Sequence, residues 1–150
     1  MTHVRSRLDL ASLPVSAAVT TRGKELAATD TVGEARAIFA NGSVQVVPVL
    51  SGSAYRGALT REAVFGDLDL DPRTPVAELA AHVVPTALAR TSSAEAFAEL
   101  DRLGATRLVV LDDDGTTYRG LVCLRSDRAR VCVDAECHTA PVNAIDERTP

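Results

Sequence analysis

Aromatic residues and lysine are the scarcest parts of this sequence. Its 150 residues include no tryptophan, two tyrosines and three phenylalanines, so aromatics make up 3% of the chain. A hydrophobic core must therefore be built from valine, leucine, isoleucine and alanine, and stacking of nucleic-acid bases on aromatic side chains is not expected. Lys24 is the single lysine, so arginine carries nearly all the positive charge, which we attribute to genomic base composition and not to function.

The sequence also lacks the marks of nucleic-acid-binding, membrane and secreted proteins. Its formal net charge of -4 argues against the basic face that nucleic acids require. No apolar run approaches the roughly 18 residues of a membrane span, and neither Arg5 nor Arg7 is followed by the apolar segment of a secretory signal. Three cysteines without disulfide-type spacing fit a reducing compartment, so we expect a cytoplasmic protein with neither nucleic-acid nor membrane partners.

A hydrophobic content of 46% is enough for one compact domain, and residues 44–60 form its most distinctive stretch. A valine-rich segment, a Ser-Gly-Ser turn and a second extended segment follow one another, which is typical of a β-hairpin. Gly57 lies within the second segment, and Thr60 ends it. Pro48 has no N–H to donate, so we expect the first strand to lie at a sheet edge or to expose its middle.

Helices are predicted on both sides of this hairpin. Thr31 and Glu34 have the spacing of a capping box, and a stripe of apolar residues follows at helical spacing. We expect this helix to end at Gly42 in a left-handed cap. A second helix is predicted at residues 61–65, directly after the hairpin.

The same arrangement returns later in the chain. The Pro-Val pair at residues 14–15 recurs at 75–76, a spacing of 61, and a second capping box follows at the same spacing. The tripeptide Tyr-Arg-Gly at 55–57 recurs at 118–120, 63 residues on, because the second turn is two residues longer. Agreement of this kind indicates an internal duplication of a β-α-β-β-α unit.

The duplication divides the chain into four parts. We expect an N-terminal arm at residues 1–13, a first unit at 14–72 and a second unit at 73–127. Residues 128–150 are then a C-terminal tail, with a strand or loop at 129–134.

Taken together, these motifs resemble a tandem pair of CBS domains, also called a Bateman module. The resemblance covers roughly residues 14–127 and includes the hydrophobic-Pro-Val strand and the Gly-hydrophobic-hydrophobic-Thr segment. The matching segments are Val47-Pro48-Val49 and Gly57-Ala58-Leu59-Thr60 in the first copy, and Leu108-Val109-Val110 and Gly120-Leu121-Val122-Cys123 in the second. It implies an α/β (α+β) fold in which two β-α-β-β-α units pack as a pseudo-two-fold pair.

The resemblance also implies a ligand site. CBS pairs bind adenine-containing ligands (AMP, ADP, ATP or S-adenosylmethionine) in clefts between the units. The glycine lets the backbone approach, the Thr hydroxyl meets phosphate, a carboxylate accepts from ribose, and the strands contact adenine. The residues that these roles point to in this sequence are Thr20, Thr21, Leu26, Val47, Pro48, Gly57, Thr60, Arg61, His82, Val109, Gly120, Cys123 and Asp127.

The sequence departs from the family pattern at the ribose carboxylate. The first copy has Ala63 at that position, with Glu62 one residue early. The second copy has Cys123 in place of Thr and Ser126 in place of Asp, with Asp127 one residue late. Loss of a charged hydrogen bond costs about 1.5–3 kcal/mol, so we expect nucleotide affinity to fall at least about tenfold.

Two candidate contacts have simpler interpretations. Thr60 and Arg61 form either an anion site or an ordinary N-cap followed by a solvated arginine. The resemblance places His82 near the cleft mouth, although a histidine among apolar neighbours is more often structural or exposed.

The cysteines and the acidic turn also leave alternatives open. Cys123 is either a thiol activated at a helix N-terminus or a small, partly buried core residue. Cys132, Cys137 and His138 suggest zinc, but a closed four-ligand site needs a further ligand. The Asp-rich segment 112–115 resembles a calcium loop only superficially, and a hairpin turn explains it.

No catalytic motif is present, so we expect a non-catalytic regulatory module with no required cofactor, acting on a regulated protein in a separate chain. One alternative is a degenerate pair used as a dimerisation or interaction adaptor, and a weaker one is a cysteine-based redox or metal sensor. We expect a homodimer formed through apolar helical faces that include Val64, Phe65 and Leu68.

Overall fold

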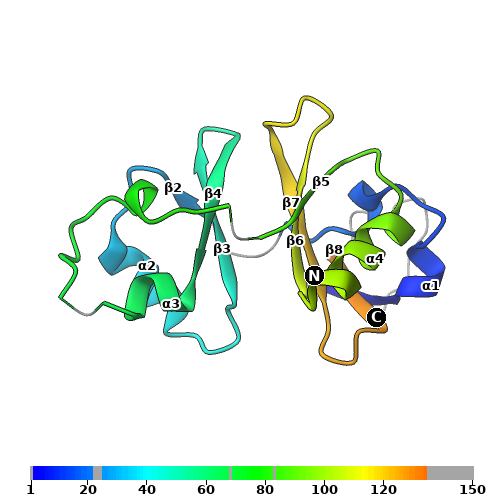
Figure 1. Ribbon diagram of the computed structural model, residues 1–150, viewed down its shortest axis with the longest axis horizontal. Coiled ribbons are helices and arrows are strands. Elements are labelled where there is room, and N and C mark those ends of the chain that lie inside the picture. Colours follow the sequence, from blue (N-terminus) through cyan, green and yellow to red (C-terminus); the bar gives the residue numbers. More distant parts are fainter. Residues whose placement is uncertain (1, 22–24, 68, 83, 135–150) are drawn as a thin grey trace.

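The computed structural model describes residues 2–21, 25–67, 69–82 and 84–134. They form two α+β units whose sheets lie toward the middle of the molecule and whose helices lie outside (Figure 1). The first unit contains β2 (Leu26–Ala27), α2 (Val32–Phe39), β3 (Val46–Ser51), β4 (Ala54–Thr60) and α3 (Arg61–Phe65). The second contains β1 (Thr2–Ser6), α1 (Arg7–Leu10), β5 (Thr86–Leu88), α4 (Ser93–Leu103), β6 (Arg107–Leu111), β7 (Tyr118–Leu124) and β8 (Arg130–Asp134). None of the helices in these ranges is long and apolar enough to cross a membrane.

Each unit is built on the predicted hairpin. The first sheet has the order β2-β3-β4 and the second the order β1-β8-β7-β6-β5, with each hairpin antiparallel. The expectation that β3 lies at an edge is wrong, because β3 pairs with both β2 and β4. Its proline is accommodated because Pro48 lies opposite Ala58, just before the two residues that pair with the short strand β2. Pro48 is also buried, so the middle of the strand is not exposed.

The helix starts follow the predicted capping chemistry. The Glu34 N–H donates to the Thr31 hydroxyl at 3.3 Å, and the Glu34 carboxylate accepts from the Thr31 N–H at 3.0 Å. The predicted left-handed cap at Gly42 is wrong, since α2 already ends at Phe39 and its C-cap residue is right-handed. The corresponding cap exists in the second unit, where Gly104 has φ of 67°.

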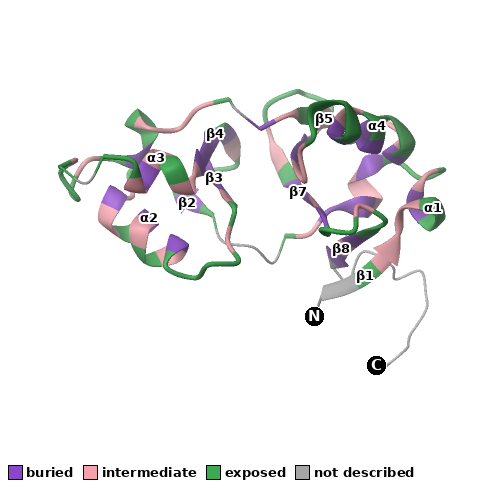
Figure 2. Cartoon of the chain, turned by 60° about the horizontal axis from the view of Figure 1, so that its bottom comes forward, coloured by how far each residue is buried: buried purple, intermediate pink, exposed green. Residues whose placement is uncertain are grey.

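Each Pro-Val segment packs against the unit that is built from the other copy. Pro14 bridges to Ser92 of the second unit, and Pro75 bridges to Thr31 of the first. Val15, in the short 3-10 helix η1 (Val15–Ala18), is fully buried in the second unit's core. Its counterpart in η2 (Val76–Glu78) is fully buried in the first unit's core. Each core is thus completed by the segment that precedes the other copy, and Figure 2 shows the buried residues along the strands and on parts of the helices.

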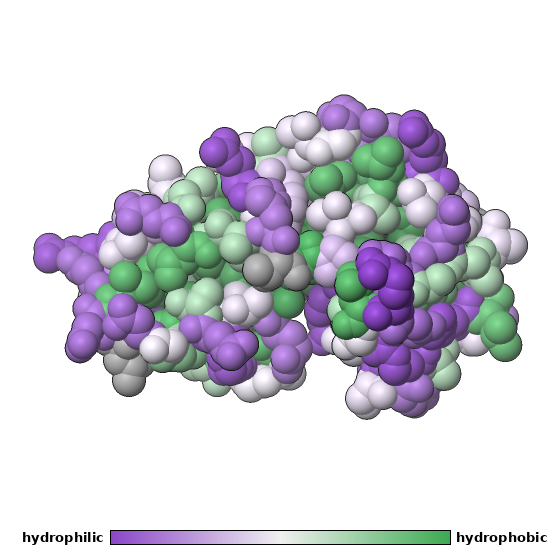
Figure 3. Space-filling view, in the orientation of Figure 1, coloured by the Kyte–Doolittle hydropathy of each residue, from purple (hydrophilic) through white to green (hydrophobic). Residues whose placement is uncertain are grey.

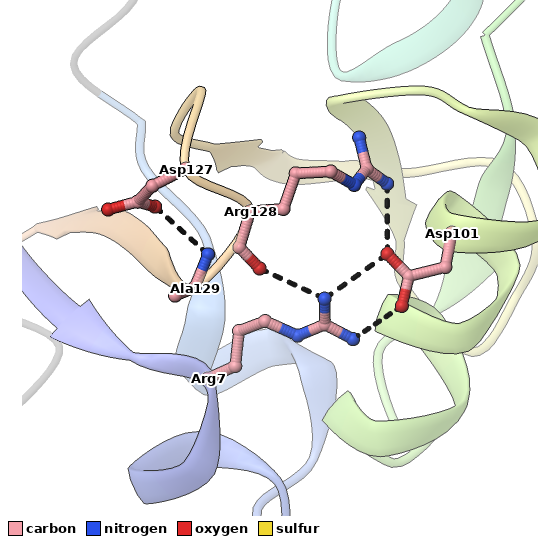
Figure 4. Close-up of polar contacts among 5 residues, drawn as sticks. All are labelled: Arg7, Asp101, Asp127, Arg128 and Ala129. Carbon is pink, nitrogen blue, oxygen red and sulfur yellow. Dashed lines mark hydrogen bonds and ion pairs between the residues drawn. The ribbon is translucent and has the colours of Figure 1, made fainter.

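The second unit ends differently from the first. In the first unit helix α3 follows β4, whereas in the second unit strand β8 follows β7. The expectation of a helix after Cys123 is therefore wrong. The arm at the N-terminus pairs with β8 as strand β1. Arg7 then holds this edge to α4 through Asp101, with bonds of 3.1 and 2.8 Å, as Figure 4 shows.

The apolar residues from which we expected a dimer face belong largely to the core. Val64 is fully buried, and Phe65 is partly buried against the first unit's core. Leu68 lies outside the described residues. The homodimer therefore stays a prediction without support from this face.

Candidate functional site

The two units meet through an apolar layer between their sheets. The buried residues of this layer come from both hairpins and from the segment before β5, and they are Leu50, Tyr55, Ala58, Val84, Val109, Leu111 and Leu121. Because both sheet faces contribute, a cleft that opens beside this layer is bounded by both units.

The glycines of the duplicated tripeptide admit the chain's own backbone. Gly57 has φ of 131°, and a Cβ there would lie 3.1 Å from the Ala81 nitrogen. Gly120 has φ of 148°, and a Cβ there would lie 2.9 Å from the Val19 side chain. Each glycine thus lets the segment that crosses from the other copy run alongside the hairpin, and Ala58 and Ala81 exchange two backbone hydrogen bonds of 3.0 and 3.1 Å.

A cleft of about 480 Å³ opens at the end of the interface where β4 ends and β6 begins. Figure 3 shows the surface hollowed where the two units meet. The first unit lines the cleft with Gln45, Val46, Thr60, Arg61 and Glu62, and the second unit with Val84, Pro85, Ala105, Thr106 and Arg107. Of the residues predicted from the sequence, the structure brings Thr60 and Arg61 to this cleft.

Thr60 is half-buried at the point where β4 passes into α3. Its hydroxyl accepts from the Ala63 N–H at 3.4 Å, so it caps the helix as one of the two interpretations predicts. A threonine hydroxyl that accepts one bond still has its O–H to donate. Capping and contact with a ligand oxygen are therefore compatible.

Arg61 holds neighbouring backbone segments together. The simpler interpretation, in which this arginine is solvated, is wrong. Its guanidinium donates to the carbonyls of Phe39 at 2.6 Å, of Asn41 at 3.2 Å and of Val44 at 3.0 Å. It also lies 5.6 Å from the centre of the Phe39 ring. The side chain therefore links α3 to the loop between α2 and β3. Because its donors are bonded to these carbonyls, Arg61 affects a ligand in the cleft mainly through its positive charge.

Arg107 is the cationic residue that sequence reasoning missed. It comes from the first residue of β6, and its Nη1 donates to the Thr106 hydroxyl at 3.1 Å and to the carbonyls of Thr106 and Leu124 at 3.2 and 3.4 Å. Its equivalent in the first copy is Val46, 61 residues earlier, which also lines the cleft. A charged residue at a position where the repeat has valine was the signal that could have identified it.

Most of the other predicted contacts lie in the cores or the interface. Leu26 and Val47 belong to the first unit's core, and Val109 lies in the layer between the sheets. Thr20 is bridged to Leu121, with its N–H donating to that carbonyl at 2.9 Å. Thr21, which follows, is exposed.

His82 is exposed and packs against Tyr55 of the layer between the sheets. Its ring meets Tyr55 edge-on, with ring centroids 5.9 Å apart and planes at 74°. His82 does not line the cleft of Thr60 and Arg107.

Asp127 and the acidic segment at 112–115 are turn residues. Asp127 Oδ1 accepts from the N–H groups of Ala129 and Arg130 at 2.9 and 3.2 Å, and these bonds lower the pKa of its carboxyl. Asp114 caps the turn at Thr116 and Thr117 in the same way. The oxygens of Asp127 are engaged in the turn between β7 and β8, and Asp127 does not line the cleft of Thr60, so its role as a ligand contact stays a prediction.

Cys123 lies in β7 and not at a helix start. It is half-buried, and burial raises the pKa of its thiol. Cys137 and His138 of the suggested zinc set lie outside the described residues. Within the described ranges, no three or more His, Cys, Asp or Glu side chains gather closely enough to hold a metal.

No family model and no curated protein matches this chain. Solved structures do share its fold. The cystathionine β-synthase (CBS) pair domain of a Shewanella oneidensis MR-1 protein assigned as a Mg²⁺ transporter covers 80% of this chain and 72% of its own, with 20% identity and a TM-score of 0.66. The CBS domain of a bacterial CNNM/CorC-family Mg²⁺ transporter, in complex with ATP, covers 78% and 85%, with 21% identity and a TM-score of 0.61.

A Vibrio cholerae protein assigned to acetoin utilization is similar to the same extent. It covers 74% of this chain and 84% of its own, with 16% identity and a TM-score of 0.63. At these identities the likeness concerns the fold, and it confirms the predicted pair of α+β units.

Proposed function

Because the chain has the fold of a tandem CBS pair, we propose that it is a non-catalytic regulatory module that binds an adenine nucleotide or related adenosyl ligand between Thr60 and Arg107. The observation that carries this proposal is the cleft of about 480 Å³, to which the two units contribute a hydroxyl and a guanidinium. Clefts of roughly 300–1,000 Å³ accept small organic ligands. Two similar structures, a CNNM/CorC CBS domain and the cytosolic domain of the MgtE channel, are complexes with ATP.

The lining supplies the two kinds of contact that a nucleotide needs. Arg107 offers a planar, permanently charged group for phosphate, and the Thr60 hydroxyl offers a donor on the opposite wall. Val46, Val84 and Pro85 offer apolar surface for the base. Glu62 adds a negative charge to the same cleft, which partly offsets the attraction of Arg61 and Arg107 for phosphate.

The test is a thermal-shift screen of the full chain with AMP, ADP, ATP, S-adenosylmethionine and NAD, followed by calorimetric titration of any ligand that shifts the melting temperature. We expect a saturable shift with at least one of them. Arg107→Gln should weaken that binding severalfold. Arg119→Gln is the matched control, because it removes the same charge from an exposed position on β7 that does not line the cleft.

Two results would reject nucleotide binding here. One is the absence of any shift at millimolar ligand, and the other is equal binding by the wild type and Arg107→Gln. The absence of any shift favours the second candidate function, an interaction adaptor without a small ligand, whereas equal binding by the two proteins places the nucleotide outside this cleft. The adaptor function rests on Ala63 at the position of the ribose carboxylate and on the engagement of Asp127 in a turn. Nucleotide at stoichiometric amounts in the purified protein would exclude the adaptor.

A further inference from the structure

Two cysteines face each other across the second sheet. Cys123 of β7 and Cys132 of β8 are direct partners in the antiparallel register. Both are half-buried, and both are free thiols. The Cys132 side chain is close enough to Cys123 to contribute to the raised pKa of its thiol, after burial, which is the larger cause.

The Cα separation at this pair lies within the range of a disulfide. Two residues further along, the Arg125 N–H donates to the Arg130 carbonyl at 2.9 Å, so Cys123 and Cys132 occupy the same hydrogen-bonded type of position. The Cα atoms of such a pair lie about 5.5 Å apart. A disulfide spans about 4.4–6.8 Å between Cα atoms, so this separation admits the bond. Opposite Cβ atoms lie about 4.5–5.5 Å apart and are closer only in non-hydrogen-bonded pairs, whereas a relaxed disulfide needs about 3.5–4.5 Å. The bond would therefore pull the strands together, be strained and be readily reduced.

Two guanidinium groups flank the pair on the same face of the sheet. Arg125 Nη1 lies 3.8 Å from Cys132 Sγ, and Arg107 is the partner of Cys123 on the other side, in β6. The thiolate, not the thiol, is the reactive form of a cysteine. Burial raises the pKa of the Cys123 thiol and holds it protonated, so we assign Cys132 as the attacking thiol and Cys123 as the second to react.

We infer that Cys123 and Cys132 form a site of reversible covalent modification, oxidised to a disulfide by a small-molecule disulfide. The Cys132 thiolate attacks one sulfur of the small disulfide, which forms a mixed disulfide and releases one small thiolate. Cys123 then gives its proton to water and attacks the Cys132 sulfur, which releases the second. The two protein sulfurs lose two electrons, and the small disulfide gains them and becomes two thiols.

The bond would join strands that are otherwise held by few contacts. β8 pairs with β7 at two positions and with β1 at five. A disulfide between Cys123 and Cys132 ties the β1–β8 edge covalently to the rest of the sheet. This inference is independent of nucleotide binding, because it rests on the register of β7 and β8.

The experiment uses the reduced full chain in mixtures of reduced and oxidised glutathione, followed by acid quenching, alkylation and mass spectrometry. We expect the oxidised chain to carry two fewer alkyl groups than the reduced chain, and tryptic peptide 120–125 to be linked to peptide 131–148. Because Cys137 shares the second peptide, the Cys137→Ser variant must form the same link. Cys123→Ser should stop at glutathione bound to Cys132, and dithiothreitol should reverse both products.

A second measurement tests whether the fold, and not the closeness of the two cysteines in the sequence, brings the thiols together. The same glutathione series in concentrated urea should give the linked product at a much lower fraction, because the register no longer aligns the thiols. The inference is overturned if the folded Cys137→Ser chain keeps both thiols throughout the series. It is also overturned if the link joins two chains, or if it forms equally in urea.

Discussion

Tyr55 and Tyr118, the tyrosines of the duplicated Tyr-Arg-Gly tripeptide, stack on each other where the two hairpins meet. Their ring centroids lie 6.5 Å apart, with 23° between the planes. The Tyr55 N–H donates to the Thr116 carbonyl and the Tyr118 N–H to the Ser53 carbonyl, both at 2.9 Å. The repeat thus places each tyrosine against the equivalent tyrosine of the other copy, and the stack lies where the two pseudo-symmetric units meet.

The environment of the Tyr55 hydroxyl yields the first prediction. This hydroxyl is buried, and it has no hydrogen-bond partner in the part of the chain that the structure describes. Replacing such a group by hydrogen is neutral or stabilising. We expect Tyr55→Phe to change the free energy of unfolding by between zero and about +1 kcal/mol, measured by urea unfolding at neutral pH. A loss of more than about 1 kcal/mol would show that the hydroxyl is bonded.

Alkaline unfolding gives a second test of the same group. Burial raises the pKa of Tyr55 from 10.0 to about 12. Between these values the unfolded tyrosine loses its proton while the folded one keeps it, so stability is full below the lower value and falls as pH rises through the window. We expect the urea midpoint of the wild type to fall over this range and that of Tyr55→Phe to fall less. Equal slopes would contradict the burial of the hydroxyl.

The glycines of the two hairpins support a third prediction. Gly120 has a positive φ, and an added Cβ would clash with Val19 at 2.9 Å. Strained backbone alone costs about 1–3 kcal/mol, so Gly120→Ala should destabilise the fold by at least about 2 kcal/mol in urea unfolding. Gly42→Ala is the control, because Gly42 has no positive φ and no atom within 4 Å of its Cβ position. There we expect a gain of about 0.4–1 kcal/mol. Equal effects at the two positions would refute the close approach.

The repeat predicts the order of the elements well because each element has a local cause. The capping box at Thr31, the Ser92 cap, the hairpin turn and the Pro-Val turns are set by neighbouring residues, and the structure forms them. The exchange of the Pro-Val segments has no such local signal. Val15 and Val76 occupy equivalent positions in the repeat, so spacing cannot tell which core each one fills.

The cleft was harder to predict because its residues come from both units. Thr60 belongs to a motif. Arg107 stands out in the sequence only as an arginine where the first copy has Val46, and the fold is needed to place it in the same cleft as Thr60. The motif glycines were assigned to a ligand, yet Gly57 is approached by the backbone of Ala80 and Ala81. A family motif shows that a close approach is needed at a position, and only the fold shows what approaches.

From the ion pairs of Asp101 we predict a loss of stability at acidic pH. Arg7 and Arg128 donate to this carboxylate, which lowers its pKa from 3.8 to about 2, as Figure 4 illustrates. Because the folded pKa is depressed, the contribution to stability is present above the unfolded value and is lost as pH falls through the window. We expect the urea midpoint of Asp101→Asn to depend less on pH in this window than that of the wild type. Asp69→Asn, at an exposed turn, is the control and should keep the wild-type slope.

Glu62 provides the sharpest functional prediction, which rests on nucleotide binding in the cleft. Its carboxylate lines the same cleft as Arg107 and repels a phosphate there. At several ångströms and in partly aqueous surroundings, one such repulsion is worth about 1 kcal/mol, so Glu62→Gln should tighten nucleotide binding about two- to tenfold. The gain should be larger for ATP than for AMP and should shrink as salt rises, because the repulsion grows with ligand charge and is screened by ions.

Glu78→Gln makes the same charge change at an exposed position outside the cleft lining and should leave the affinity unchanged. Calorimetric titration of the three proteins at two salt concentrations measures this, and an unchanged or weaker affinity in Glu62→Gln would place the phosphates away from this cleft.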